Sequence, residues 1–381
     1  MSTGSAQDRN GQNPAPAHKF GRDTAVRELL RPLEPYLKRD GVTEVVINRP
    51  GEVLYEQGAA WMREDVPDLP YGRLMSLVKA IGTFSDQEVG PKTPILSAIL
   101  PDGQRVQIMV PPAVPPETIS LSIRLPAKEI RSLNQYVDDG AFDRFVWAAP
   151  KDLMRLRADI EPEDLGLVDA LQSRDLPGFF KAAIKGRRNL AIVGDTGSGK
   201  TTLMKTLCQD IPHSDRLITI EDVRELLLPN HPNCVNLLYS KGGQGVASVT
   251  PADLIAACMR MRPDRVLLAE LRGSEAFDFL KLLTTGHSGS ITSYHAESCA
   301  LALERYVLMA KEHKDAAIFD AEGLKRLVRL TIDIIVHVRA QIVADEKGEM
   351  RKERFVSEVY FDPVKRRRDR FEDNVVLKGA A

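Results

Sequence analysis

The segment GDTGSGKT, at residues 194–201, limits most strongly what this chain can fold into. It follows the apolar run Leu190–Val193 and fits the pattern GxxxxGK[ST] of a phosphate-binding loop. Its glycines let backbone N–H groups wrap phosphates without Cβ clashes, and the helix that starts behind it adds partial positive charge. Lys200 is expected to reach the β- and γ-phosphates of a nucleotide, and the Thr201 hydroxyl to bind Mg²⁺. The predicted nucleotide-binding residues of this segment are Gly194, Thr196, Gly197, Ser198, Gly199, Lys200, Thr201 and Thr202.

From Asn189 onward, short apolar runs alternate with helix-forming stretches, as expected of buried parallel strands connected by helices. We expect strands in LAIV, RLITI, DRVLLAEL and GSITSY, and a closing hairpin around Gly348. The expected helices are Lys200–Cys208, Pro251–Met259, Ser274–Leu283 and Ser298–Met309. Residues 188–381 are therefore predicted to form a C-terminal α/β domain of the RecA-like, P-loop type.

The first third of the chain has a different pattern. Residues 1–22 lack apolar periodicity and are expected to be disordered. Apolar residues at three- and four-residue spacing predict helices over Val26–Leu37 and Tyr71–Phe84. The strand signals are two short strands around the turn at 49–51, a hairpin around Asp102 and Gly103, and a strand in TISLSIRLP. Residues 23–127 are therefore predicted to form an N-terminal α+β domain with a mixed antiparallel sheet.

Acidic residues follow two of the expected core strands. Glu270 ends the run RVLLAE, as in a Walker B element, while Glu221 and Asp222 follow LITI, with Glu225 three residues further on. The carboxyl ends of parallel strands form the edge where ligands bind in an open α/β sheet. A single acid in such a place commonly caps a helix or faces solvent. Two such strand ends beside a phosphate loop instead predict catalytic roles for Glu270 and for at least one acid of the 221–225 segment.

Two histidines lie in the segment TTGHSGSITSYHA, after the Walker B strand and a helix. A lone histidine is more often structural, but His287 and His295 occupy a Gly/Ser-rich turn and the end of the strand that follows it. Either could donate a hydrogen bond to the γ-phosphate or to the attacking water. We therefore predict a catalytic role for His287 and a sensor role for His295.

The composition is that of a globular protein with 43% hydrophobic and 28% charged residues. The formal net charge of −1 gives no general attraction for nucleic acid, so sequence-specific nucleic-acid binding is not expected. No apolar run reaches the roughly 18–20 residues that span a bilayer, and the first residues lack a signal-peptide pattern. The four cysteines form no CxxC pair, which argues against a zinc site and a disulfide framework.

The four segments GDTGSGKTT, ITIEDVRE, RPDRVLLAELR and TTGHSGSITSYHA occur in the order found in the type II/IV secretion ATPase superfamily, which this sequence resembles. Within it, TEVVINRPGEVLYE, ILSAILPDGQRVQIMVPP and TISLSIRLP are similar to the first domain of the VirB-eleven-type traffic ATPases of type IV secretion. The resemblance covers about Thr24–Val338. Ala269 replaces the usual glycine before the Walker B acid, and the four-cysteine module of the type II branch is missing.

The resemblance implies ATP hydrolysis by a homo-hexamer that powers transfer of DNA or protein, or pilus assembly. ATP and Mg²⁺ would lie between the two domains of each subunit, with Glu225 polarising the attacking water and Glu270 serving the metal or its water. It also implies a cytoplasmic protein, peripherally associated with inner-membrane components of the secretion machine and with other secretion ATPases.

Five arginines lie where this family brings arginines toward the nucleotide. Arg105 and Arg124 belong to the first domain, and both fall on the polar faces of their expected strands, although a solvated strand face would show the same alternation. Arg260, Arg262 and Arg272 flank the Walker B strand and resemble positions used near the nucleotide, in the same subunit or in a neighbour. The planar guanidinium suits phosphate oxygens.

Residues 128–187 have few strand signals and are predicted to be mostly helical. This linker is longer than short members of the resembling family need. It could carry the first domain onto a neighbouring subunit, which would give a domain-swapped ring. Alternatively, it could fold back as a local helical appendage.

Two other functions are compatible with the same core. One is a DNA-translocating, RecA-class ATPase, to which the basic run 365–370 would contribute, although such runs are usually solvated ends. The other is a nucleotide-dependent scaffold with little turnover, against which the complete set of acids argues.

Overall fold

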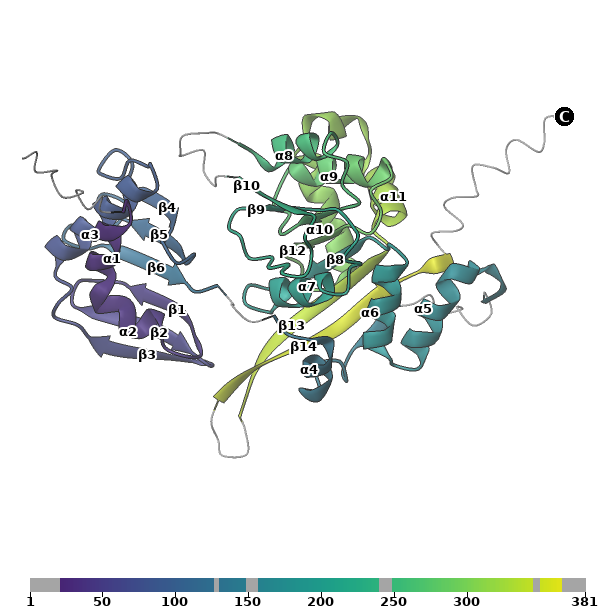
Figure 1. Cartoon of the computed structure of the whole chain (residues 1–381), viewed down its shortest axis with the longest axis horizontal. Coiled ribbons are helices and arrows are strands. Elements are labelled where there is room, and N and C mark those ends of the chain that lie inside the picture. The colour runs from purple at the N-terminus through teal and green to yellow at the C-terminus, as the bar shows by residue number, and fades with distance from the viewer. Residues whose placement is uncertain (1–20, 127–129, 149–156, 240–248, 345–349, 365–381) are drawn as a thin grey trace, which may run out of the picture.

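Two β-sheets organise the chain, an antiparallel one in the first third and a mainly parallel one in the rest (Figure 1). The computed structural model describes residues 21–126, 130–148, 157–239, 249–344 and 350–364. The predicted disorder of residues 1–20, the turn around Gly348 and the basic run 365–370 lie outside the described residues. None of the helices within these ranges is long and apolar enough to span a membrane.

The first sheet has six strands in the order β3-β2-β1-β6-β5-β4, all paired antiparallel. They are β1 (Val42–Ile47), β2 (Glu52–Gln57), β3 (Ala60–Asp65), β4 (Ile95–Ile99), β5 (Arg105–Met109) and β6 (Ser120–Arg124). The predicted strands and hairpin are thus confirmed, whereas β3 was missed. Every residue of β3 except Glu64 is exposed, so its sequence does not alternate between buried and exposed positions.

Helices pack on one face of this sheet. The predicted helix Tyr71–Phe84 is confirmed as α3. The predicted continuous helix over Val26–Leu37 is wrong, because the chain forms α1 (Thr24–Leu30), a 3₁₀ turn η1 (Arg31–Leu33) and α2 (Glu34–Leu37) instead. Pro32 and Pro35 have no backbone N–H to donate, which interrupts the helix. The apolar spacing is still used, since Val26 and Leu33 are fully buried.

The second sheet has eight strands in the order β10-β9-β11-β12-β8-β13-β14-β7. They are β7 (Val146–Ala148), β8 (Leu190–Val193), β9 (Leu217–Glu221), β10 (Cys234–Leu238), β11 (Arg265–Leu268), β12 (Ile291–Tyr294), β13 (Ile334–Ala344) and β14 (Met350–Phe361). All neighbours are parallel except β13 and β14, which form the predicted closing hairpin. The order places the carboxyl ends of β8, β9, β11 and β12 at one edge, which we call the carboxyl edge.

Helices cover both faces of this sheet. On one face lie α4 (Leu133–Asp138), α5 (Pro162–Gln172), α6 (Leu176–Lys185) and α7 (Lys200–Cys208). On the other lie α8 (Pro251–Cys258), α9 (Glu275–Thr284), α10 (Cys299–Lys311) and α11 (Ala321–Thr331). Short 3₁₀ turns, η2 (Arg157–Asp159) and η4 (Lys314–Ile318), complete the described elements. The four helices predicted from the sequence are confirmed within two residues at each end.

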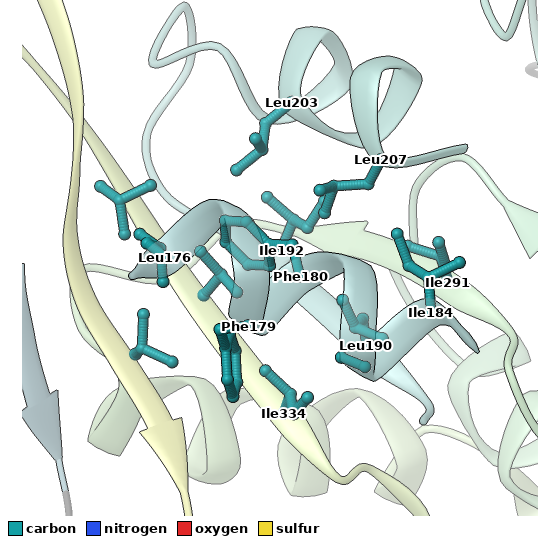
Figure 2. Close-up of a cluster of buried hydrophobic side chains, with 14 of the residues drawn as sticks. Leu176, Phe179, Phe180, Ile184, Leu190, Ile192, Leu203, Leu207, Ile291 and Ile334 are labelled. Atoms are coloured by element: carbon teal, nitrogen blue, oxygen red, sulfur yellow. The ribbon is translucent and has the colours of Figure 1, made fainter. Parts of the chain in front are cut away.

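The segment before the phosphate loop packs on the sheet of its own chain. Phe179, Phe180 and Ile184 of α6 lie against Ile192 of β8 and Leu203 of α7 in one buried cluster (Figure 2). In its described part, 130–148 and 157–187, the segment forms mainly helices as predicted. The strand β7, which pairs in parallel with β14, was missed because it has three residues. We therefore propose that the ATPase-type domain begins near Leu133 rather than at residue 188.

Candidate active site

The phosphate loop leaves the carboxyl edge at the end of β8 and enters α7. Three of its glycines adopt positive φ angles, 150° at Gly194, 74° at Gly197 and 98° at Gly199. A Cβ atom on Gly194 would lie 2.1 Å from the carbonyl oxygen of Val338, so only glycine fits there. The Ser198 hydroxyl is buried without a hydrogen-bond partner in the described structure. The glycines therefore keep the loop free of side chains, and the Ser198 hydroxyl is available to hydrogen-bond a ligand. Both features suit a phosphate-binding site.

Lys200 lies inside this loop, with only 8% of its surface exposed. Its Nζ donates to the carbonyl oxygens of Gly194 and Asp195, both at 2.8 Å, and lies 3.3 Å from Nδ1 of His295. Burial lowers the pKa of Lys200 to about 8, a shift that Glu270 opposes and Arg124 strengthens. The amine is thus held at the loop by acceptors that a phosphate could replace.

Glu270 follows β11 and connects to Lys200 through His295. The Glu270 Oε1 atom lies 3.1 Å from Nε2 of His295, and Oε2 accepts from Arg272 at 2.5 and 3.0 Å. Burial would raise the pKa of Glu270, but Arg272, His295 and Lys200 outweigh it and lower that pKa. Burial and the charge of Lys200 lower the pKa of His295, which favours a neutral imidazole. Such a ring can accept from Lys200 at Nδ1 and donate to Glu270 from Nε2.

A cavity of about 280 Å³ opens beside this group. Its lining residues are Glu270, Leu271, Arg272, His295, Arg305 and Met309. Arg305 and Met309 belong to α10. The carboxylate of Glu270 therefore borders an open space shared with this helix.

The three acids of the 221–225 segment have different roles in the structure. Glu221 is fully buried and accepts from the backbone N–H groups of Glu225 and Leu226, both at 2.8 Å. Burial raises its pKa, and these hydrogen bonds oppose the shift. Asp222 accepts from Arg272 at 3.1 Å. The carboxylate of Glu225 is 22% exposed, whereas that of Glu221 is fully buried.

The two arginines of the first domain both approach the carboxyl edge. The Arg105 Nη2 atom donates to Asp222 at 2.8 Å and lies 2.9 Å from Glu225. Arg124 is exposed, but its charge reaches Lys200 and contributes to the lowering of that pKa. The side chain of Arg105 is therefore not simply solvated, because the polar face of its strand brings it to Asp222 and Glu225.

Three residues predicted near the nucleotide lie elsewhere in their own chain. His287 precedes β12, and its Nδ1 atom lies 3.2 Å from the Thr285 hydroxyl and 3.3 Å from the carbonyl of Leu282. The strand β12 lies between the two histidines, so His287 is at its amino end and His295 is at its carboxyl end, on the carboxyl edge. The structure does not bring His287 to the phosphate loop of its own chain, and its catalytic role stays a prediction. Arg260 and Arg262 are exposed and precede β11, so they lie, like His287, on the side of the sheet where the parallel strands begin.

Sequence reasoning missed two basic residues of β14 beside the phosphate loop. Arg354 donates from Nε to the carbonyl of Gly197 at 3.0 Å. Lys352 lies 3.3 Å from the position of a Cβ atom on Gly197. The alternation in RKERF indicates that one face of this strand is basic. It does not indicate that this face contacts a loop more than 150 positions earlier in the chain.

The chain was compared with known proteins. A family model described as "Type II/IV secretion system protein" matches residues 156–375. The type IV secretion system protein VirB11 of Brucella suis is 43% identical over 348 residues, which cover 91% of this chain and 92% of the relative. PtlH, the type IV secretion system protein of Bordetella pertussis, is 38% identical over 342 residues, covering 90% and 96%.

Two solved structures are also similar. The VirB11 ATPase of the Brucella suis type IV secretion system, crystallised with sulphate, is 42% identical and superposes with a TM-score of 0.50, covering 92% of this chain and 98% of that one. The Legionella pneumophila ATPase DotB is 16% identical with a TM-score of 0.54, covering 96% and 86%, and indicates the fold alone.

Proposed function

The chain belongs to the type II/IV secretion system protein family, with the VirB11-type traffic ATPases of type IV secretion, and we propose that it hydrolyses ATP at the carboxyl edge of its second sheet. The observation that carries this proposal is the connected series Lys200, His295 and Glu270 at the phosphate loop. It joins a phosphate-binding amine to an ionised carboxylate through one imidazole. Hydrolysis needs both a charge that stabilises the phosphates and a group that orients water.

Nucleotide phosphates would bind in the loop of residues 194–199. Backbone N–H groups of this loop and the start of α7 would face the phosphate oxygens. Lys200 would exchange its two carbonyl acceptors for β- and γ-phosphate oxygens. Thr201 and Thr202, in the first turn of α7 and partly exposed, would complete the binding set. Arg105 and Arg124 would close the site from the first domain.

Mg²⁺ fits the donors that are present. In the described part of the chain no three His, Cys, Asp or Glu side chains cluster as a metal cage. Mg²⁺ usually keeps several waters and takes few protein ligands besides substrate phosphates. The Thr201 hydroxyl and the Glu270 carboxylate, directly or through water, would hold it. When bound, the ion neutralises charge that develops on the phosphates.

Glu225 would polarise the attacking water, and His295 would sense the γ-phosphate. Glu225 is partly exposed, and Nη2 of Arg105 lies 2.9 Å from its carboxylate. His295 already contacts both Lys200 and Glu270, so a phosphate bound at Lys200 would lie within its reach. Glu221 would act indirectly, by holding the turn that carries Glu225.

We further propose that six copies form a ring in the cytoplasm, peripherally associated with inner-membrane components of the machine and with other secretion ATPases. The exposed Arg260 and Arg262, far from their own phosphate loop, are available to a neighbour. The cavity beside Glu270 offers space for a side chain from another subunit. The mass of the particle in solution, with and without ATP and Mg²⁺, tests the ring.

Phosphate release by the full chain tests the proposed activity. The wild type should release phosphate from ATP with Mg²⁺, and chelation of the metal with EDTA should stop it. Lys200→Ala should lose both nucleotide binding and turnover, because the amine buried inside the loop is removed. Absence of turnover in an assembled wild-type particle would leave a nucleotide-dependent scaffold as the function.

A further inference from the structure

The hairpin of β13 and β14 runs along the outer side of the phosphate loop. The parallel register pairs His337 of β13 with Val193 of β8, so the hairpin continues beside the loop where β8 ends. On β14, Lys352 and Arg354 are two positions apart and share one face of the strand. That face meets the phosphate loop.

Arg354 contacts the loop at two of its glycines. Its Nε donates to the carbonyl of Gly197 at 3.0 Å, and its Cδ would lie 3.2 Å from a Cβ atom on Gly199. A peptide unit is planar and trans, so its C=O and N–H point in opposite directions. Because the Gly197 carbonyl points out toward Arg354, the N–H of Ser198 points into the loop, where it donates to the Asp195 carbonyl at 3.2 Å. The guanidinium and the Asp195 carbonyl thus fix the orientation of the peptide between Gly197 and Ser198 from its two sides.

Lys352 connects the same loop to the first domain. Its Nζ lies 3.4 Å from Oε1 of Glu56 on β2, and the two side chains are 23% and 20% exposed. Glu56 also accepts from the Thr43 hydroxyl at 2.6 Å. Burial would raise the pKa of Glu56, but the Thr43 hydrogen bond and the charges of Lys352 and Arg354 lower it, so this carboxylate is ionised at neutral pH. Elements of both domains therefore meet at Gly197.

We propose that Arg354 and Lys352 are positioning residues for the phosphate loop, and that the ion pair of Lys352 with Glu56 makes nucleotide affinity depend on the placement of the first domain. This inference rests on the proposed nucleotide site, but not on hydrolysis. Arg354 acts through the Gly197 peptide rather than on the nucleotide. Glu56 acts through Lys352, whichever chain of the ring supplies it.

Binding of a fluorescent ADP analogue with Mg²⁺ to the full chain tests the role of Arg354. Glutamine places its amide nitrogen at the same bond distance from the backbone as the arginine Nε, whereas methionine has a methyl group there. Arg354→Met should weaken binding about tenfold, the usual effect of losing one charge-assisted hydrogen bond. Arg354→Gln should stay within about threefold of the wild type, because it keeps the donor. Thermal midpoints without nucleotide identify any variant that fails to fold.

The outcomes separate this inference from the proposed function. Arg351→Ala is the matched control, because Arg351 lies on the same strand, is exposed and pairs with Glu353 at 3.3 Å away from the loop. If Arg354→Met binds like the wild type, or if Arg354→Gln loses as much affinity as Arg354→Met, positioning through Gly197 is wrong while nucleotide binding stands. If the wild type does not bind the analogue, the proposed function itself is wrong.

Charge reversal tests the connection to the first domain. Glu56→Lys and Lys352→Glu should each weaken binding of the analogue about threefold, as expected for a partly exposed ion pair. The double variant restores the opposite charges and should recover wild-type affinity. Additive losses in the double variant, or no loss in either single variant, would show that this pair does not couple the domains.

Discussion

The Nη2 atom of Arg105 lies 2.9 Å from a carboxylate oxygen of Glu225, although one residue belongs to the first sheet and the other follows a strand of the second. The same nitrogen donates to Asp222 at 2.8 Å. The arginine is 30% exposed, so solvent screens the pairing only in part. The first domain thus contributes a positive charge to the carboxyl edge, and this charge contacts Glu225, the acid proposed to act on water.

Arg105→Ala should weaken nucleotide binding about tenfold, because a guanidinium that can contact phosphate is lost. Turnover should fall as well, since Glu225 loses the partner that orients it. Titration with a fluorescent nucleotide and steady-state phosphate release measure the two effects. Arg63→Ala is a suitable control, because Arg63 is a 65% exposed arginine of the same sheet whose ion pairs among the described residues are with Glu52 and Asp65. Unchanged affinity in an Arg105→Ala, Arg124→Ala double variant would make the first domain a docking module only.

Glu221 should be essential for the fold of the acidic turn rather than for chemistry. Glu221→Ala leaves the buried N–H groups of Glu225 and Leu226 without their acceptor, which should cost about 2–6 kcal/mol of stability. The thermal midpoint of the ATPase-type domain should therefore fall, and turnover with it. Glu225→Gln should lose turnover without this loss of stability, since Glu221 keeps its hydrogen bonds. If Glu225→Gln hydrolyses ATP like the wild type, the water-activating acid is another member of the turn.

The two histidines of the TTGHSGSITSYHA segment should differ in their effect on turnover. His295→Ala removes the contact between Lys200 and Glu270 and should lower turnover at least about tenfold. His287→Ala should leave it within about twofold, because His287 lies at the opposite edge of the sheet. Both rates come from the same phosphate-release assay. A larger loss in His287→Ala than in His295→Ala would mean that His287 acts on a neighbouring subunit's site.

Much of the carboxyl edge could be predicted from the sequence, because each of its segments directly follows a strand that its own residues indicate. The phosphate loop follows an apolar strand directly, and Glu270 and Glu225 follow strands of the same sheet, so strand order alone brings them together. The sequence also placed Arg105 and Arg124 on polar strand faces, and the structure brings both toward that edge.

The rest depended on information that is not local. A strand was already predicted between the two histidines, but the motif was given more weight than the separation between the two ends of that strand. Arg354 and Lys352 were missed because a hairpin near the end of the described chain brings them to the loop. Residues 128–187 gave helix signals but no indication that α6 would form the core beneath β8. The helix at Val26–Leu37 failed because its apolar spacing was given more weight than its two prolines.

We predict that in the ring the first domain packs on a neighbour's ATPase-type domain. The contacts of Arg105 and of Glu56 can be made within one chain, as here, or between chains with the same surfaces. A short bis-maleimide cross-linker between Glu56→Cys and Lys352→Cys should join two chains in the assembled particle. Cross-links confined to single chains would instead support the local arrangement.

The central claim, that ATP is hydrolysed at the carboxyl edge with Glu270 as an essential acid, is tested most directly by measuring nucleotide affinity and phosphate release together for Glu270→Gln. Glutamine keeps the shape of the side chain and removes its charge. We expect affinity for a fluorescent ATP analogue within about threefold of the wild type and turnover lower by at least about a hundredfold, since a charge needed at the reacting phosphate is lost. Wild-type turnover in Glu270→Gln would contradict the account.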